Sequence, residues 1–240
     1  MTGETITLRR DGEIARVRID RPEAGNMMSA GMIAELTRLL NEAGSDPALK
    51  AVLLTGAGAD FCLGREPGAG GASRTALEMR ESLTGPILGL YAAARGAEIP
   101  VVASVQGRAA GFGCATAAVC DLTIAADDAR FSLPEMTHDL PPTLAMCAHI
   151  DRTMPKAIAW LVYSTESVDA ATARTLGFVS HVVPAASLEA ETEALVATLA
   201  ARRRDALITC KRFLANARLM ETDKAADYAG NMLSVILSSR

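Results

Sequence analysis

Two turns rich in small residues are the segments of this chain whose composition could support chemistry. They cover residues 55–64 and 107–113, and each follows a continuous apolar run. A strand that ends in a glycine turn and opens a helix directs backbone N–H groups outward at the positive end of the helix dipole. Two such turns side by side could hold one developing oxyanion. Glycines equally permit tight turns and close packing, so the residues alone leave both interpretations open.

Two titratable side chains on one later segment are candidates for proton transfer. Glu135 ends the segment 131–135, and His138 follows three residues later on the same loop. A carboxylate or an imidazole can exchange protons with a substrate when its surroundings bring its pKa near the working pH. The ordinary alternatives are a solvated glutamate and a surface or packed histidine. For His138, as for His149 and His181, that ordinary role is favoured.

Several common catalytic and binding motifs are missing from the chain. It has no G-x-S-x-G elbow, no P-loop and no H-E-x-x-H pair. Gly56 and Gly58 are followed by Phe61 where a dinucleotide fingerprint requires glycine. The five cysteines are scattered and form no C-x-x-C pair, which argues against a zinc site. We therefore expect no metal.

The elements that must position these groups alternate between strands and helices. Residues 13–20 alternate in polarity as a half-buried strand, and residues 5–9 are expected to pair with it across a turn at Asp11-Gly12. Ser29 can cap a helix with an apolar stripe from Met32 to Leu40. Repeated units of this kind predict an α/β core. The continuous apolar strands are residues 51–55, 101–105 and 122–126, and the later helices are residues 186–202 and 221–238.

Length and charge limit the class of protein. A chain of 240 residues suits one α/β domain, alone or with a helical appendage. Its net charge of -4 gives no support for nucleic-acid binding, and Arg202-Arg203-Arg204 is interpreted as a solvated helix end. No apolar run has transmembrane length, and no signal peptide is recognised at the start. The odd number of cysteines with apolar neighbours predicts reduced thiols in a cytoplasmic protein.

Five segments, in the right order and spacing, resemble the crotonase family, also called the enoyl-CoA hydratase/isomerase family. Together they cover nearly the whole chain. Residues 105–121 are the most informative, because they are similar to the family's V-x-G-x-x-x-G-G-G-C-E…C-D segment. The other four are residues 21–26, 53–64, 125–135 and 170–183.

The resemblance implies a fold, a substrate and an assembly. The fold would be a spiral of ββα units over residues 1–184, followed by a C-terminal helical region over residues 185–240 that builds homotrimers, often paired into hexamers. That region looks shortened relative to the family, which leaves hexamer assembly open. The substrate would be an acyl-CoA thioester. Coenzyme A enters as part of the substrate, and no separate cofactor is expected.

In this family two backbone N–H groups bind the thioester oxygen as an enolate forms. By matching positions, the resemblance assigns them to Leu63 and Phe112. Phe112 is a departure, because the family usually has glycine there and phenylalanine tolerates a left-handed backbone poorly. Either its φ is conventional, or the turn has shifted and the oxyanion hole is impaired.

The resemblance also decides which reaction is favoured. Glu135 matches the glutamate that exchanges protons with the acyl chain, whereas Ala115 stands where a hydratase has its second glutamate. Isomerisation needs only one base, so double-bond isomerisation through Glu135 is favoured. Hydration would require a compensating group such as His138. An alternative hypothesis, in which the protein is not primarily an enzyme, is a CoA-ester-binding oligomer subunit with little activity.

Contacts to the substrate are less specific. Glu23 stands where the family often has a basic residue, and Arg21, Arg65 and Lys211 are possible substitutes for binding the CoA phosphates. The glycine-rich segment 64–75 could be a wall of the acyl pocket or an ordinary connection. The substrate-binding candidates are Ala24, Gly64, Arg65, Gly111, Ala115, Arg21 and Lys211.

Overall fold

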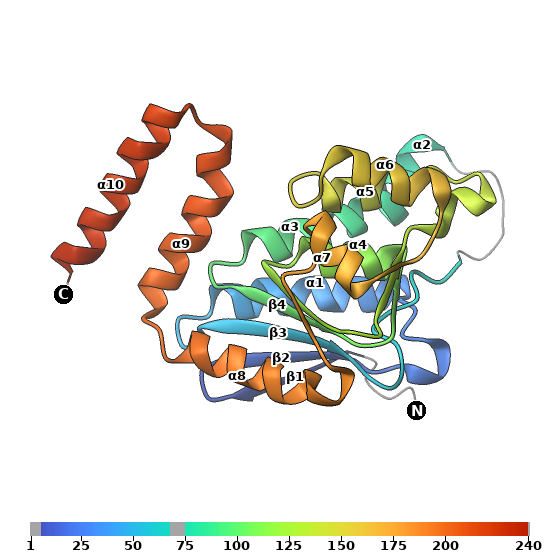
Figure 1. Ribbon diagram of the computed structural model, residues 1–240, viewed down its shortest axis with the longest axis horizontal. Coiled ribbons are helices and arrows are strands. Elements are labelled where there is room, and N and C mark those ends of the chain that lie inside the picture. Colours follow the sequence, from blue (N-terminus) through green and yellow to red (C-terminus); the bar gives the residue numbers. More distant parts are fainter. Residues whose placement is uncertain (1–5, 68–74, 240) are drawn as a thin grey trace.

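The computed structural model describes residues 6–67 and 75–239, and its main element is a six-stranded sheet (Figure 1). The strand order is β1-β2-β3-β4-β6-β9, in which β1 and β2 are antiparallel and all other neighbours are parallel. The predicted strands are confirmed, including the pairing of the first two across the turn after Asp11. The strands are β1 (Ile6–Asp11), β2 (Ile14–Ile19), β3 (Ala51–Gly56), β4 (Val101–Val105), β6 (Leu122–Ala126) and β9 (His181–Val183).

A second, smaller sheet stands beside the first and gives the fold its repeated ββα character. It contains β5 (Arg108–Ala110), β7 (Arg130–Ser132) and β8 (Val168–Asp169). β5 follows β4 directly and β7 follows β6, so successive units each send one strand to either sheet. An isolated bridge from Cys62 to Ala109 extends this layer with the segment that follows β3. The segments that follow β3, β4 and β6 therefore lie side by side in this second layer.

One face of the large sheet is covered by α1 (Ala30–Ser45) and α3 (Gly85–Gly96). The helix α1 begins as predicted, because the Ser29 hydroxyl accepts a hydrogen bond from the Met32 N–H at 3.2 Å. Its predicted apolar stripe is buried against the sheet. The two helices approach closely where a Cβ on Gly44 would lie 2.7 Å from the Ala97 Cβ.

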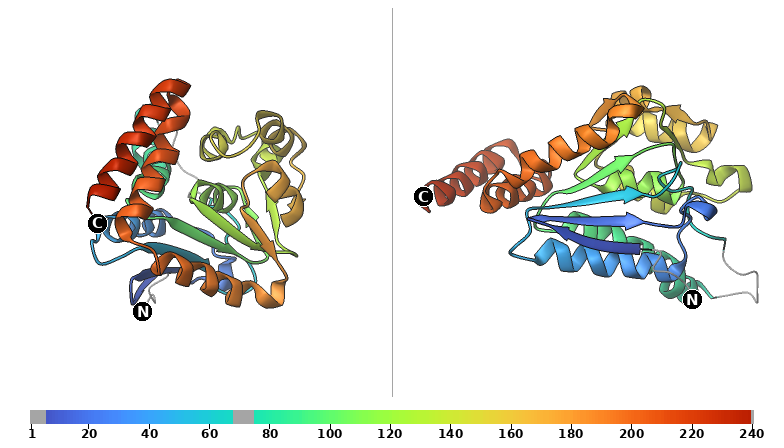
Figure 2. Two further views of the ribbon diagram at one scale, coloured as in Figure 1. Left: turned by 60° about the vertical axis from the view of Figure 1, so that its left-hand side comes forward. Right: turned by 90° about the horizontal axis from the view of Figure 1, so that it is seen from below.

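The opposite face carries α8 (Leu188–Ala200), as Figures 1 and 2 show. Val196 of α8 packs with Ile14, Leu53 and Val102, whose side chains alternate with those facing α1. The helical region expected from residue 185 therefore divides in space. Its first helix covers the sheet, whereas α9 (Arg204–Asn216) and α10 (Thr222–Ser238) form a hairpin that projects from the body.

Shorter helices surround the end of the sheet where the chemistry is expected. The helix α4 (Phe112–Val119) is buried along its whole length and lies against α3 and α5. No helix in residues 6–67 or 75–239 is both long and apolar enough to cross a bilayer. The remaining elements are α2 (Ala76–Met79), α5 (Thr143–His149), α6 (Pro155–Ser164), α7 (Ala170–Leu176), a π-helical turn η2 (Arg80–Thr84), and the 3-10 turns η1 (Pro22–Ala24), η3 (Pro134–His138), η4 (Ala185–Ser187) and η5 (Ala217–Leu219).

His149 is a packed histidine behind α4, in line with its favoured ordinary role. Its side chain is fully buried, with Nδ1 3.0 Å from the Thr153 hydroxyl and its ring edge-on to Phe178 at 4.9 Å. Burial disfavours the imidazolium and lowers the pKa of His149 to about 4. The folded protein therefore holds this imidazole neutral.

We expect the stability of the fold to decrease as the pH falls from about 6.5 toward 4. The unfolded chain binds a proton at His149 below its ordinary pKa of 6.5, and the folded chain does so only near 4. This group should cost about 2 kcal/mol of unfolding free energy between pH 7.5 and about pH 5. Urea denaturation of wild type and His149→Gln at both pH values measures it. The exposed His181→Gln is the control, and equal pH dependence in all three proteins would contradict the assignment.

Candidate active site

The two small-residue turns lie side by side and are joined through their main chains. The N–H groups of Phe61 and Cys62 both donate to the Arg108 carbonyl, at 3.1 and 3.2 Å, and the Ala110 N–H donates to the Cys62 carbonyl at 3.0 Å. A Cβ on Gly113 would lie 2.1 Å from that same carbonyl oxygen. The two turns are therefore close together, as binding of one oxyanion would require, and their approach depends on a position without a side chain.

The segment before α1 supports the first turn from the other side. Asn26 is fully buried, and its amide donates to the carbonyls of Ala57 and Asp60 at 2.8 and 2.7 Å. Its Oδ1 accepts from the Arg21 N–H at 2.9 Å. One side chain thus satisfies three backbone groups that would otherwise be unpaired in a buried loop.

The free N–H group on the first turn differs from the prediction for Leu63. The Leu63 N–H donates to the Gly25 carbonyl at 2.9 Å and is therefore already paired. Two residues later, Arg65 pairs with Met28 in an isolated parallel β-bridge. Its hydrogen bonds are made by the residues on either side of Arg65: the Gly64 carbonyl accepts from the Met28 N–H, and the Glu66 N–H donates to the Met28 carbonyl. The Arg65 N–H faces away from Met28, because backbone donors alternate in direction along an extended segment. It meets no acceptor among the described residues.

The second turn ends in a left-handed residue, and that residue is Gly111, with φ 51° and ψ -116°. Phe112 begins α4 with a negative φ, so the question raised by its side chain is answered in favour of a conventional backbone. Its N–H is one of the first N–H groups of the helix, which have no partner within the helix. No acceptor for it occurs in the part of the chain that is described.

The carboxyl group of Glu135 lies beside this second turn. Its Oε1 is 2.8 Å from the position that a Cβ on Gly111 would occupy. Its Oε2 is buried and has no hydrogen-bond partner in the described residues. Burial raises the pKa of Glu135 above its ordinary value, because desolvation penalises the charged form. A buried carboxyl with an open lone pair beside unpaired N–H groups has the features of a proton-transfer site.

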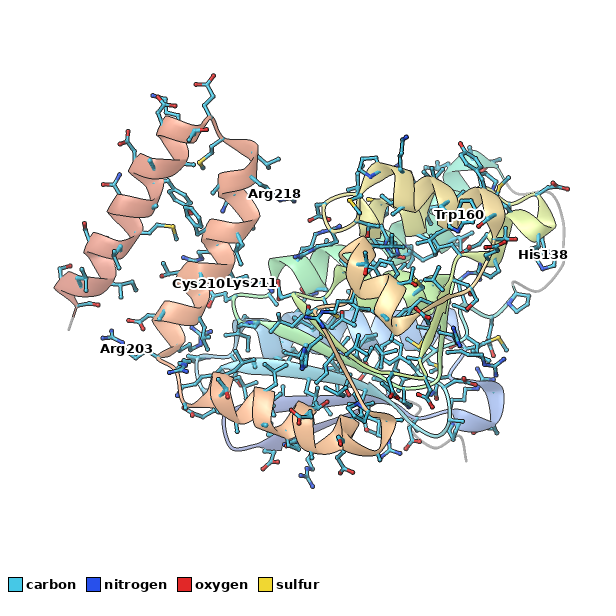
Figure 3. All side chains as sticks on the ribbon, in the orientation of Figure 1. His138, Trp160, Arg203, Cys210, Lys211 and Arg218 are labelled. Carbon is cyan, nitrogen blue, oxygen red and sulfur yellow. The ribbon has the colours of Figure 1, made fainter. Side chains whose placement is uncertain are left out.

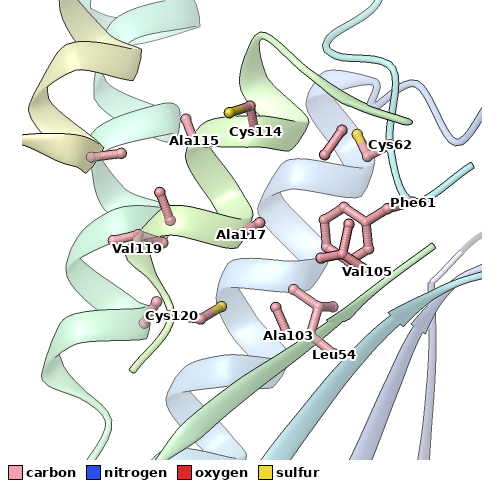
Figure 4. Close-up of a cluster of buried hydrophobic side chains, with 14 of the residues drawn as sticks. Leu54, Phe61, Cys62, Ala103, Val105, Cys114, Ala115, Ala117, Val119 and Cys120 are labelled. Carbon is pink, nitrogen blue, oxygen red and sulfur yellow. The ribbon is translucent and has the colours of Figure 1, made fainter. Parts of the chain in front are cut away.

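Ala115 and His138 occupy different surroundings. Ala115 is fully buried within α4, where Figure 4 shows its methyl group next to Cys114. His138 is exposed at the end of η3 and lies at the edge of the molecule in Figure 3. It makes no hydrogen bond to any residue that the structure describes, so a role beside Glu135 has no structural support.

Most of the expected substrate-binding residues surround the first turn. Gly64 has φ 122° and packs near the Ala110 carbonyl, while Ala24 lies half-buried in η1. The Arg21 guanidinium forms an ion pair with Glu66. Arg65 is half-exposed and has no ion pair within the described residues. The glycine-rich segment expected to line the acyl pocket lies largely outside the described residues, at 68–74.

Lys211 does not fit the phosphate-binding role expected of it. Its side chain is 8% exposed, and its ammonium group lies 2.7 Å from Asp121 and donates to the carbonyls of Ala94 and Ile99 at 3.0 and 3.1 Å. All three donors of this group therefore have partners. Lys211 instead connects the middle of α9 to the core, and Figure 3 shows it between the two ends of that helix.

The described residues contain no group of three or more histidine, cysteine or acidic side chains able to hold a metal ion. All five cysteines are free thiols. A family model for enoyl-CoA hydratase/isomerase proteins matches residues 9–238.

The chain belongs to the enoyl-CoA hydratase/isomerase family.

Relatives and solved structures agree with this assignment. A probable enoyl-CoA hydratase of Mycobacterium tuberculosis is 32% identical over 200 residues, which cover 83% of this chain and 76% of the relative. The enoyl-CoA hydratase of Mycobacterium smegmatis superimposes with a TM-score of 0.91 at 28% identity, over 97% of this chain and 91% of that one. A putative enoyl-CoA hydratase of Thermobifida fusca, in complex with CoA, has a TM-score of 0.88 at 28% identity, over 98% and 93%. The predicted crotonase-like α/β fold is confirmed.

The sequence does not predict two features of this family member. It indicates a role for the Arg65 guanidinium only, whereas the bridge to Met28 leaves the Arg65 backbone N–H free. Tyr91 stacks on Phe112 with ring centroids 6.2 Å apart and planes 22° apart. Nothing in the local pattern marks Tyr91, because an aromatic residue in an apolar helix is ordinarily part of the core.

We expect Gly113→Ala to disrupt the junction of the two turns. Gly113 has a negative φ in α4, so alanine would otherwise favour the helix, but the new Cβ meets the Cys62 carbonyl at 2.1 Å. The backbone must shift, which should cost about 2 kcal/mol of unfolding free energy. Gly89→Ala in α3 is the matched control, since nothing lies within 4 Å of its Cβ. Urea denaturation compares the two, and equal stability changes would contradict the close approach.

Proposed function

We propose that this protein isomerises the double bond of an enoyl-CoA thioester, with Glu135 as its single acid/base. The observation that supports this most directly is the buried, unpaired Oε2 of Glu135, in a carboxyl group that lies against Gly111, the residue before the free Phe112 N–H. Ala115 presents only a methyl group where a hydratase of the family has its second carboxylate. Isomerisation requires one base that removes a proton and returns the same proton elsewhere.

In the proposed reaction, the N–H groups of Arg65 and Phe112 donate to the thioester oxygen. Glu135 removes a proton from C2 of a 3-enoyl-CoA, and the electron pair of that C–H bond delocalises into a dienolate. The protonated Glu135 then delivers the proton to C4, and the double bond comes to lie between C2 and C3. The raised pKa of Glu135 favours this shuttle, because the carboxyl group retains the proton between the two transfers.

The acyl-CoA substrate is also a proposal drawn from relatives. The Thermobifida fusca neighbour was solved in complex with CoA. Arg65, which is half-exposed, would bind a phosphate of CoA, and Arg21 would first have to leave Glu66. We propose a cytoplasmic location as well, which agrees with five free thiols.

Hydration is the second candidate, favoured by the names of the relatives. They include a short-chain-enoyl-CoA hydratase of Clostridium acetobutylicum, 29% identical over 189 residues. Hydration would need a group besides Glu135 to hold the attacking water. A weakly active CoA-ester-binding subunit is the alternative from another class, supported by the bulky Phe112 in the second turn.

We further propose that the chain assembles as a homotrimer or hexamer through its C-terminal hairpin. The helices α9 and α10 expose several large apolar side chains, among them Leu214, Leu233 and Val235 at 71%, 57% and 67% exposure. Between the two helices lies an apolar groove of about 380 Å³ lined by Phe213 and Met232. A surface of this kind is costly to leave in water and is typical of an interface.

The reaction is tested with purified protein offered a 3-enoyl-CoA in one arm and a 2-enoyl-CoA in the other. We expect the conjugated thioester absorbance to rise in the first arm, and Glu135→Gln to reduce kcat by about a thousandfold. Glu166→Gln, at an exposed position, is the control and should retain activity. Loss of absorbance in the second arm with a 3-hydroxyacyl product would establish hydration instead. No turnover in either arm, with CoA-ester binding unaffected by Glu135→Gln, would favour the binding subunit.

The assembly is tested by light scattering of wild type and Leu233→Glu. We expect the wild type to have at least three times the mass of one chain and the variant to dissociate, because a charge enters the apolar face. Leu77→Glu, at a comparably exposed leucine on α2, should leave the mass unchanged. A monomeric wild type would overturn the proposed assembly.

A further inference from the structure

Tyr91 is a buried phenol in the wall of the candidate site. It belongs to α3, is 2% exposed, and is the largest of the fully buried side chains. Its ring stacks on Phe112, the first residue of α4. Its hydroxyl makes no hydrogen bond to any residue described in the structure, and its oxygen is not one of the buried side-chain atoms that lack a partner there.

Tyr91 and Glu135 lie against two adjacent residues of the main chain. The Tyr91 ring packs on Phe112, and the Glu135 Oε1 lies against Gly111, the residue before it. Burial and then the charge of Glu135 raise the pKa of Tyr91. The phenol therefore keeps its proton to higher pH than an ordinary tyrosine, and as a neutral hydroxyl it can act as a hydrogen-bond donor to the Glu135 carboxylate.

Other titratable groups near this pair are placed less well. The charge of Glu135 also raises the pKa of the Cys114 thiol in α4, but the Cys114 Sγ lies 3.7 Å from His149 Nε2. Arg95 of α3 and Cys147 of α5 act on Tyr91 more weakly than Glu135 does. His138 and Asp139 at the end of η3, and Lys156 of the adjoining α6, are all exposed.

We propose that Tyr91 is the positioning residue of Glu135, and that its hydroxyl donates a hydrogen bond to the Glu135 carboxylate when substrate is bound. The inference rests on the proposed role of Glu135. Catalytic hydrogen bonds are often long before substrate binds and shorten in the complex. Such a bond stabilises the ionised carboxylate against the effect of burial and fixes its direction toward the acyl chain. The neutral Tyr91 hydroxyl thereby orients the Glu135 carboxylate, and Glu135 remains the single base in the site.

Tyr91→Phe removes this hydroxyl and keeps the ring that stacks on Phe112. We expect kcat to fall about tenfold to a hundredfold with little change in KM, as for loss of one hydrogen bond to a charged group. The acidic limb of the kcat profile, which reports ionisation in the substrate complex, should move to higher pH, because the ionised carboxylate loses a donor. Tyr163→Phe, at a 79% exposed tyrosine, is the matched control and should change neither. An unchanged acidic limb in Tyr91→Phe would overturn the proposal.

A second measurement does not depend on turnover. Carbon-detected NMR follows the titration of the Glu135 carboxyl with the saturated thioester butyryl-CoA bound. We expect its pKa to rise in Tyr91→Phe and to fall when the three tyrosines are replaced by 3-fluorotyrosine, whose more acidic hydroxyl is a stronger donor. The second replacement keeps every side chain near its native size, so it remains informative if Tyr91→Phe folds poorly.

The two measurements separate the two proposals. Shifts of the Glu135 titration in both directions, in a protein that turns over neither enoyl-CoA, would support Tyr91 as the partner of Glu135 and overturn the proposed reaction. An identical titration in wild type, Tyr91→Phe and the fluorinated protein would overturn the role of Tyr91, whatever the protein catalyses.

Discussion

The contact between the main chains of two turns is the constraint on which the site depends. Cys62 and Gly113 approach so closely that a single methyl group on the glycine would meet the Cys62 carbonyl. That contact holds the first turn and the start of α4 at a fixed separation, so the N–H groups of Arg65 and Phe112 are placed by backbone alone. Backbone donors need no side-chain ordering when a charge develops, which is the reason such a site can stabilise an oxyanion efficiently.

Burial sets the protonation of the side chains beside these turns. Burial raises the pKa of Glu135, whose Oε2 has no hydrogen-bond partner in the described residues, and burial likewise raises the pKa of Tyr91. A second carboxylate at position 115 would raise the proton affinity of Glu135 further through like-charge repulsion. In the proposed reaction, Ala115 therefore affects both the number of bases and the pH at which Glu135 would work.

The C-terminal hairpin is attached by a few charged contacts rather than by a large apolar interface. Lys211, in the middle of α9, is buried against Asp121, and Arg218 after α9 lies 2.9 Å from Asp151. Removing one partner of such a buried pair leaves an uncompensated charge, so these contacts define where the hairpin leaves the core. The apolar side of the hairpin is consequently free to meet another surface.

Local patterns in the sequence determined the strands, the Ser29-capped helix and the two glycine turns, because hydrophobic periodicity and capping are properties of neighbouring residues. They also singled out Glu135 and Ala115, through a resemblance that spans the chain. Only the tertiary structure decided that the Leu63 N–H donates to the Gly25 carbonyl, that Lys211 forms an ion pair with Asp121, and that Tyr91 stacks on Phe112. Each of these depends on a partner distant in sequence, and which partner a donor or a ring meets is set by how the layers pack, which local patterns do not record.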